Sequence, residues 1–79
     1  MPKILSGKQA INILTKYFDF VVISQKGSHV KLKKITKFKN IITIVPVHKQ
    51  LARGTLRSVL KLAQIEYENF YPYMTGKKK

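Results

Sequence analysis

Two patterns of apolar positions divide the chain, and the first of them predicts a helix near the start. Between residues 7 and 18 the apolar side chains recur at the spacing of an amphipathic helix. Ser6 and Gln9 frame its first turn as a capping box, in which each side chain bonds the other residue's backbone N–H. Asp19 is expected to end the helix, because aspartate tolerates the left-handed conformation found at many helix ends.

Three short segments rich in β-branched and aromatic residues follow, and they predict strands over residues 20–25, 29–34 and 41–45. Between the first two, Gly27 predicts a tight hairpin turn. The third segment is almost wholly apolar, so we expect it to be the most buried strand. Pro46 is expected to end this strand or to lie at a sheet edge, since proline has no N–H to donate.

The helical period of apolar positions returns in the C-terminal third. A second helix is expected to begin near Thr55, with an apolar stripe formed by Leu56, Val59, Leu60 and Ala63. A shorter helical segment over residues 66–70 is expected to be ended by Pro72. Three aromatic side chains of this region are expected to close over the core: Tyr67, Phe70 and Tyr71. Residues 75–79 are expected to form a disordered basic tail.

The predicted order is therefore α-β-β-β-α, within a single domain over residues 1–74. The economical packing is an α+β fold, in which a three-stranded antiparallel sheet carries two helices on one face. In the second strand, Val30 and Leu32 must then face the helices, because burying unpaired lysines costs too much free energy. That orientation puts the alternate side chains on the open face of the sheet: His29, Lys31 and Lys33.

The charge of the chain indicates the kind of partner. Sixteen lysines and arginines face three acids, which gives a formal net charge of +13, and self-repulsion of that size favours a polyanionic partner. Nucleic acid comes first, an acidic protein second and an anionic membrane third. A merely solvated, lysine-rich surface would leave the near absence of acids unexplained.

Composition also argues against several classes of site. The chain has no cysteine, and two histidines with three acids do not make a convincing metal cluster. Neither a metal nor another cofactor is therefore expected. No apolar run approaches the roughly 18 residues that span a bilayer, and no signal peptide is visible. A soluble, cytoplasmic protein is the expectation.

Three motifs, in this order, carry a family resemblance. They are Gly27-Ser28-His29 after the first strand, Val45-Pro46-Val47-His48 after the third, and Gly54-Thr55-Leu56-Arg57-Ser58-Val59-Leu60 at the last helix. On these motifs the chain resembles the HicA (YcfA-like) toxins of type II toxin–antitoxin systems, over about residues 3–71.

The resemblance implies a double-stranded-RNA-binding-domain-like fold and an mRNA interferase, a toxin that binds and cleaves messenger RNA. It puts the family's motif histidine on His29, and it implies a HicB-type antitoxin that binds the toxin and blocks that residue. One position departs from the family pattern, because Asp19 stands where glycine is frequent. This departure bears on the end of the first helix more than on the chemistry.

RNA cleavage needs an acceptor for the 2′-OH proton and a donor for the leaving 5′-oxygen, and an imidazole suits either role near neutral pH. His29 is the predicted catalytic residue, and this chemistry requires no metal. Cations and backbone N–H groups of the turn would stabilise the negative charge of the transition state. The RNA-binding residues predicted around His29 are Lys26, Gly27, Ser28, Lys31 and Lys33.

Two further positions keep two interpretations each. His48 either contacts RNA or transfers a proton, or it simply hydrogen-bonds its own loop. The helix start at Thr55 either binds a phosphate through exposed N–H groups or is an ordinary helix end. Four aromatic side chains are expected in the core rather than as platforms for bases: Tyr17, Phe18, Phe20 and Phe38.

Two alternative functions stay open on the sequence. A non-catalytic double-stranded-RNA-binding module would need the same fold order and charge, and it would recognise duplex shape and 2′-OH groups. A purely structural partner of an acidic protein would need the charge alone. A lone histidine in a row of lysines argues against the first alternative. From its position alone, His29 is either a functional residue or an exposed strand histidine with no role, and the family resemblance favours the functional interpretation.

Overall fold

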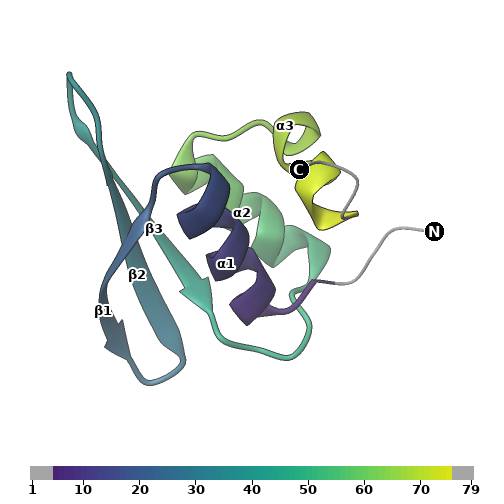
Figure 1. Cartoon of the computed structure of the whole chain (residues 1–79). Helices are drawn as coiled ribbons and strands as arrows, with labels where there is room; N and C mark the ends of the chain where they lie inside the picture. Colours follow the sequence, from purple (N-terminus) through teal and green to yellow (C-terminus); the bar gives the residue numbers. More distant parts are fainter. Residues whose placement is uncertain (1–4, 76–79) are drawn as a thin grey trace.

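The computed structural model of the protein describes residues 5–75. The elements follow in the order α1 (Gly7–Tyr17), β1 (Val21–Lys26), β2 (His29–Ile35), β3 (Asn40–Pro46), α2 (Arg53–Ala63) and α3 (Tyr67–Met74). The strands form one antiparallel sheet in the order β1-β2-β3, and the helices lie on one side of it (Figure 1). The predicted α+β, double-stranded-RNA-binding-domain-like fold is confirmed, and α3 stands where a shorter helical segment was predicted over residues 66–70. The predicted tail falls largely on residues 76–79, which lie outside the described residues.

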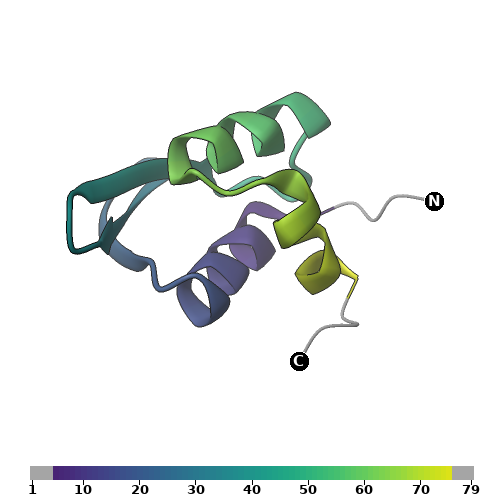
Figure 2. The same ribbon diagram turned by 90° about the horizontal axis from the view of Figure 1, so that it is seen from above.

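α1 and α2 lie side by side against the sheet, and α3 closes the end of this layer away from the strands (Figure 2). The inner face of β2 supplies Val30 and Leu32, which are 4% and 0% exposed, as predicted. On β3, the Oγ1 of the fully buried Thr43 donates a 2.8 Å hydrogen bond to the Val59 carbonyl of α2. A buried hydroxyl needs such a partner, so this bond helps to fix α2 on the sheet. The predicted stripe of α2 is buried throughout: Leu56, Val59, Leu60 and Ala63.

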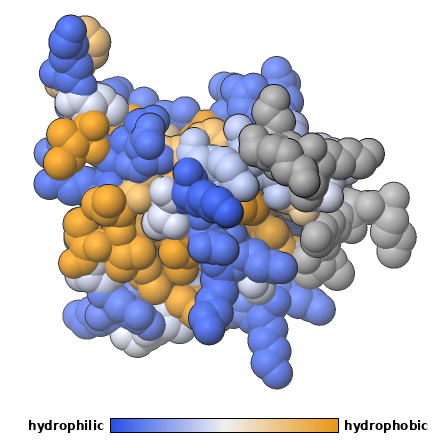
Figure 3. Space-filling view, viewed as in Figure 1, coloured by the Kyte–Doolittle hydropathy of each residue, from blue (hydrophilic) through white to orange (hydrophobic). Residues whose placement is uncertain are grey.

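Helices cover one face of the sheet, and the strands show this in their exposure. β3 is the most buried strand, as predicted, but Ile42 and Ile44 on its other face remain 38% and 39% exposed. β1 extends beyond the helical layer, so all its residues are exposed. Figure 3 shows the resulting apolar surface over β1. Aliphatic side chains are therefore accessible next to the predicted site.

The predicted capping box begins α1. The Gln9 backbone N–H donates to Ser6 Oγ over 3.0 Å, and the Ser6 N–H donates to Gln9 Oε1 over 2.9 Å. After the helix, Asp19 has a φ of 65°, the left-handed conformation expected from its residue type. The next residue, Phe20, is 1% exposed and anchors the start of the sheet in the core.

The backbone at Asp19 gives a first prediction. The left-handed region costs a residue with a Cβ roughly 1–2 kcal/mol, a cost that glycine escapes and aspartate partly offsets. In urea titrations we expect the free energy of unfolding of Asp19→Ala to be at least about 1 kcal/mol lower than that of Asp19→Gly. The Asp19 side chain is exposed, so packing changes little in either variant. Equal free energies of unfolding for the two variants would contradict this account.

The end of the chain corrects two predictions. Pro72 does not end the last helix, because α3 runs from Tyr67 to Met74 and contains it. A proline inside a helix costs about 3 kcal/mol, and burial of Phe70 and Met74, 0% and 4% exposed, opposes that cost. Tyr67 and Tyr71 do not close over the core. They are 42% and 38% exposed, and their rings pack on each other at 5.8 Å.

The aromatic residues expected in the core divide between core and surface. Phe20 is buried and Phe18 is half-buried, with its ring 5.9 Å from that of Phe70. Tyr17 is 36% exposed and packs against Tyr73 with their rings 4.4 Å apart. The prediction is wrong for Phe38, which is 90% exposed. Its position in the β2–β3 turn lies beyond the helices, so no element covers it.

Candidate functional site

His29 opens β2 immediately after the hairpin turn. Gly27 in that turn has a φ of 60°, which the turn requires and which glycine adopts without strain. The Gly27 carbonyl accepts a 3.0 Å hydrogen bond from Gln25 Nε2, which holds the turn on the side of β1. The Cα partners of His29 are Lys26 on β1 and Pro46 on β3. An exposed imidazole therefore stands at the end of the central strand.

A row of cations continues from His29 along the open face of β2. Lys31 is exposed and Lys33 is partly exposed, whereas the intervening Val30 and Leu32 are buried. The orientation predicted for this strand is thus confirmed. The row carries positive charge over the face of the sheet that the helices leave free.

Aliphatic side chains flank these cations on both neighbouring strands. Lys33 lies between Val21 of β1 and Ile42 of β3, and Lys31 lies between Ser24 and Ile44. A register shift between Val22 and Ser24 marks a bulge in β1. The open face is therefore a mixed surface, with a basic centre and exposed aliphatic margins. The sequence predicts the basic centre of this surface but not its aliphatic margins.

The first two motifs of the sequence meet next to His29. The Val47 N–H donates to the Ser28 carbonyl over 2.6 Å, and the Gly7 N–H donates to the His48 carbonyl over 2.9 Å. The start of α1, the end of β3 and the hairpin turn are therefore joined by backbone hydrogen bonds. His48 itself is exposed and stands two residues after Pro46, the β3 partner of His29.

Gly7 makes this junction possible. A Cβ on Gly7 would overlap the Pro46 carbonyl oxygen and would come within 2.9 Å of the Val47 Cα. Because both contacts are with backbone, no side-chain rotation relieves them. The sequence predicted the adjacent Ser6 as a helix cap. It did not predict that the start of α1 packs directly against the backbone of Pro46 and Val47, which leads to His48.

The third motif lies apart from this junction. α2 begins at Arg53, two residues before the predicted start, and its N-cap Ala52 offers no side-chain cap. Thr55 is half-buried in the first turn, and Gly54 is exposed. Among the hydrogen bonds of residues 5–75, none links Thr55 to the hairpin turn. A phosphate role for Thr55 thus stays a prediction.

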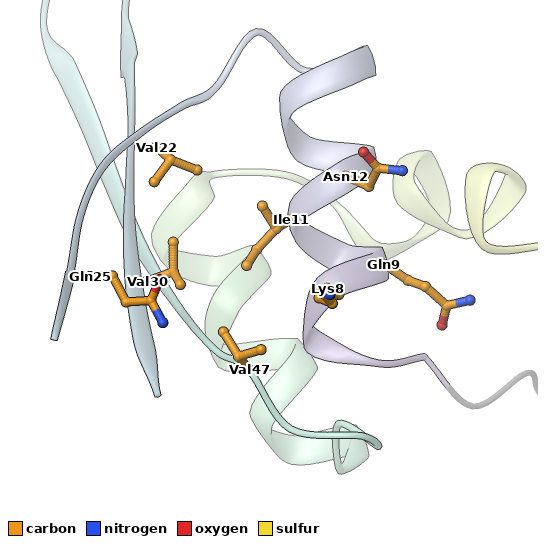
Figure 4. Close-up of a pocket in the computed structure, with 8 residues that line it drawn as sticks. All are labelled: Lys8, Gln9, Ile11, Asn12, Val22, Gln25, Val30 and Val47. Atoms are coloured by element: carbon orange, nitrogen blue, oxygen red, sulfur yellow. The ribbon is translucent and has the colours of Figure 1, made fainter. Parts of the chain in front are cut away.

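Two hollows flank the site. A cleft of about 560 Å³ lies between α1 and the β1–β2 hairpin, where Ile11, Val22, Val30 and Val47 converge (Figure 4). A second hollow of about 240 Å³ carries His48 and is lined by Ser6, Val47 and two cations, Lys8 and Lys49. The positive charge around His48 suits an anion. His29 lines neither hollow and stands free on the open face.

Two classes of feature are missing from the described part of the chain. Over residues 5–75, no helix combines the length and apolar character needed to cross a bilayer. Within the same range, histidine and carboxylate side chains do not gather in threes as metal ligands. The groups that the site does present are exposed imidazoles, ammonium groups and backbone amides.

The comparison with known families accounts for this combination of fold and motifs. The family model described as the HicA toxin of bacterial toxin–antitoxin matches residues 7–65. That range contains α1, the whole sheet and α2, together with His29 and His48. Among curated proteins, none matches the chain. The match covers well over half of the sequence, and the chain therefore belongs to the HicA family of toxins of toxin–antitoxin systems.

Proposed function

We propose that the protein is an endoribonuclease that cleaves messenger RNA without a metal and uses His29 to transfer a proton. The observation that carries this proposal is the exposed imidazole at the head of the Lys31 and Lys33 row, on the free face of the sheet. Family membership supports a toxin role. The net charge of +13 favours a polyanionic substrate.

The proposed reaction uses a nucleophile that RNA itself supplies. The 2′-oxygen attacks the adjacent phosphorus, the bond from phosphorus to the 5′-oxygen breaks, and a 2′,3′-cyclic phosphate and a 5′-hydroxyl result. His29 either accepts the 2′-OH proton or donates a proton to the leaving oxygen. Lys26 is the β1 partner of His29, and Lys31 lies two residues further along β2. Their ammonium groups would stabilise the negative charge that develops on the phosphate oxygens.

The hairpin turn is suited to hold the phosphate because its backbone is fixed. Hydrogen bonds from Gln25 and Val47 engage the carbonyls of Gly27 and Ser28. Preorganised donors lower a barrier because they need no rearrangement as charge develops. In this proposal the N–H groups of Gly27 and Ser28 supply such donors. Gly27 also leaves room for the RNA backbone to approach.

The second proton transfer falls to His48 or to a group other than histidine. His48 is joined to the junction through its carbonyl, and Lys8 and Lys49 lie around it. These cations would hold the RNA strand near its imidazole. A lysine or water would take this role if His48 acts in binding alone.

A HicB-type antitoxin is the proposed protein partner. Val21, Ile42 and Ile44 are 54%, 38% and 39% exposed around the lysine row. A surface with a basic centre and aliphatic margins complements an acidic protein that carries apolar side chains. Such a partner would cover His29. A small acidic open reading frame beside the gene would support this pairing.

The test of the proposed reaction is RNA cleavage by the full chain in EDTA. We expect single-stranded messenger RNA to be cut, with products that carry 2′,3′-cyclic phosphate ends. Loss of cleavage in EDTA would contradict the metal-independent chemistry. Tight binding of duplex RNA, with single-stranded RNA left intact after long incubation, would favour the non-catalytic double-stranded-RNA-binding module.

The lysine row leads to a separate prediction on binding. Each lysine that neutralises a phosphate of single-stranded RNA should make the slope of log affinity against log salt more negative by about 0.7. We expect the double variant Lys31→Gln/Lys33→Gln to reduce the magnitude of that slope by about 1.4 in titrations at several salt concentrations. Lys61→Gln removes an exposed charge from α2 and should leave the slope nearly unchanged. Equal effects of the two changes would mean that the row is not the surface that binds RNA.

A further inference from the structure

The β2–β3 turn carries an exposed aromatic ring at its tip. Phe38 is 90% exposed, and Ile35 beside it is 72% exposed. In Figures 1 and 3 this turn projects from the body of the molecule, past the layer of helices. A single exposed apolar side chain is common on protein surfaces. The conformation and the surroundings of this turn distinguish Phe38 from such a residue.

Thr36 holds the turn in one conformation. Its Oγ1 donates to the Lys39 carbonyl over 2.6 Å and accepts from the N–H groups of Phe38 and Lys39 over 3.3 and 3.0 Å. The Thr36 N–H also donates to the Lys39 carbonyl over 3.0 Å. The ring of Phe38 is therefore presented from a fixed backbone, which reduces the entropic cost of binding a ligand.

Lysines stand on both sides of Phe38 in the sequence, and others lie along β2 between the turn and the catalytic candidate. Lys37 and Lys39 flank Phe38 in the chain, and both are exposed. Along β2, the row of Lys31 and Lys33 leads from the turn to His29. Six steps of about 3.3 Å separate His29 from Ile35, so the end of β2 lies roughly 20 Å from His29, and Phe38 lies beyond it in the turn. A polyanionic strand that follows the row would reach Phe38.

We propose that Phe38 stacks on an unpaired base of a single-stranded RNA whose reacting phosphate lies at His29. This inference rests on the proposed action on RNA, and it adds a contact several nucleotides from the cleaved bond. An aromatic ring stacks on any base because every base has a π-face, and lysines beside it bind the adjacent phosphates. A duplex offers no free base face along its length, so the contact selects single strands and loops.

The direct test measures stacking with the full chain in its His29→Ala form, so that RNA stays intact. Single-stranded oligonucleotides of increasing length carry 2-aminopurine, a base whose fluorescence falls on stacking, at one position at a time. We expect quenching at one position distant from the site, and Phe38→Ala should abolish it. The same change should weaken binding of long oligonucleotides at least about fivefold. Oligonucleotides too short to span from His29 to the turn should bind both forms equally.

Three variants separate stacking from general apolar contact. Phe38→Trp should keep the quenching and the affinity for long oligonucleotides. Phe38→Leu keeps an apolar side chain without a ring, so it should lose the quenching. Ile35→Ala removes a similarly exposed but non-aromatic side chain from the same hairpin and should leave the quenching unchanged.

The outcomes distinguish this inference from the proposed cleavage. Phe38→Ala that binds long RNA as the parent does, while His29-dependent cleavage persists, overturns the stacking contact alone. If quenching depends on Phe38 but the parent protein, with His29 present, never cleaves RNA, the stacking contact stands and the catalytic proposal is overturned. Unchanged RNA binding combined with a weakened antitoxin complex would assign Phe38 to a protein partner and overturn the inference.

Discussion

His29→Ala is expected to lower the rate of RNA cleavage by about 10²–10⁴-fold, which is the usual contribution of one general acid or base. The side chain is exposed on the free face of the sheet, so its loss removes little packing. RNA affinity should fall little, because the lysines of the row and of the turn remain. Growth arrest on expression should disappear together with cleavage.

Cleavage rate, RNA affinity and unfolding by urea, measured on the same protein, separate chemistry from structure. His48→Ala is measured in parallel, since it removes the other exposed imidazole of the described chain. A comparable loss for His48→Ala would give it the second proton transfer, and an unchanged rate would leave that step to another group. A His29→Ala protein that cleaves at the parent rate would refute the catalytic assignment.

The orientation of the site could be predicted because it depends on a local pattern. Alternation in β2 allows two faces, and the cost of burying Lys31 and Lys33 excludes one of them. The hairpin turn was equally local, since Gly27 supplies the positive φ that the turn needs. The capping box of α1 required only two residues in the same helical turn. Each of these predictions needed no knowledge of a distant element.

The features that the sequence did not predict depend on how elements meet. Phenylalanine is a residue type that is usually buried, yet Phe38 is exposed because the β2–β3 hairpin extends further than the helices that cover the sheet. Pro72 should end a helix by its own propensity, yet the burial of Phe70 and Met74 favours its continuation. Propensity is a weak prior that tertiary packing often overrides. The aliphatic margins of the open face could likewise be predicted only from the register of all three strands.

Gly7 is the clearest feature that depends on how two distant elements meet, and its replacement is expected to have the largest effect on stability. Replacing a helical glycine by alanine ordinarily stabilises a helix, by up to about 1 kcal/mol. At Gly7 the added Cβ would overlap the Pro46 carbonyl oxygen, and overpacking against fixed neighbours costs about 1–3 kcal/mol or more. Because the overlap is with backbone, which no side-chain rotation relieves, the cost lies at the upper end of this range. After the gain in helix propensity we therefore expect Gly7→Ala to lower the free energy of unfolding by at least about 1 kcal/mol.

Gly54→Ala is the matched control, because it lies in the first turn of α2 and its added Cβ would meet nothing within 4 Å. We expect Gly54→Ala to be as stable as the parent or slightly more stable in urea titrations. Gly7→Ala should also slow RNA cleavage in its folded form, since the Gly7 N–H bonds the His48 carbonyl and Val47 bonds Ser28 beside His29. Displacing α1 would thus move the end of β3 and the turn together. Equal stability of the two alanine variants would show that α1 can shift without cost, and an unchanged cleavage rate in Gly7→Ala would show that this junction does not position the site.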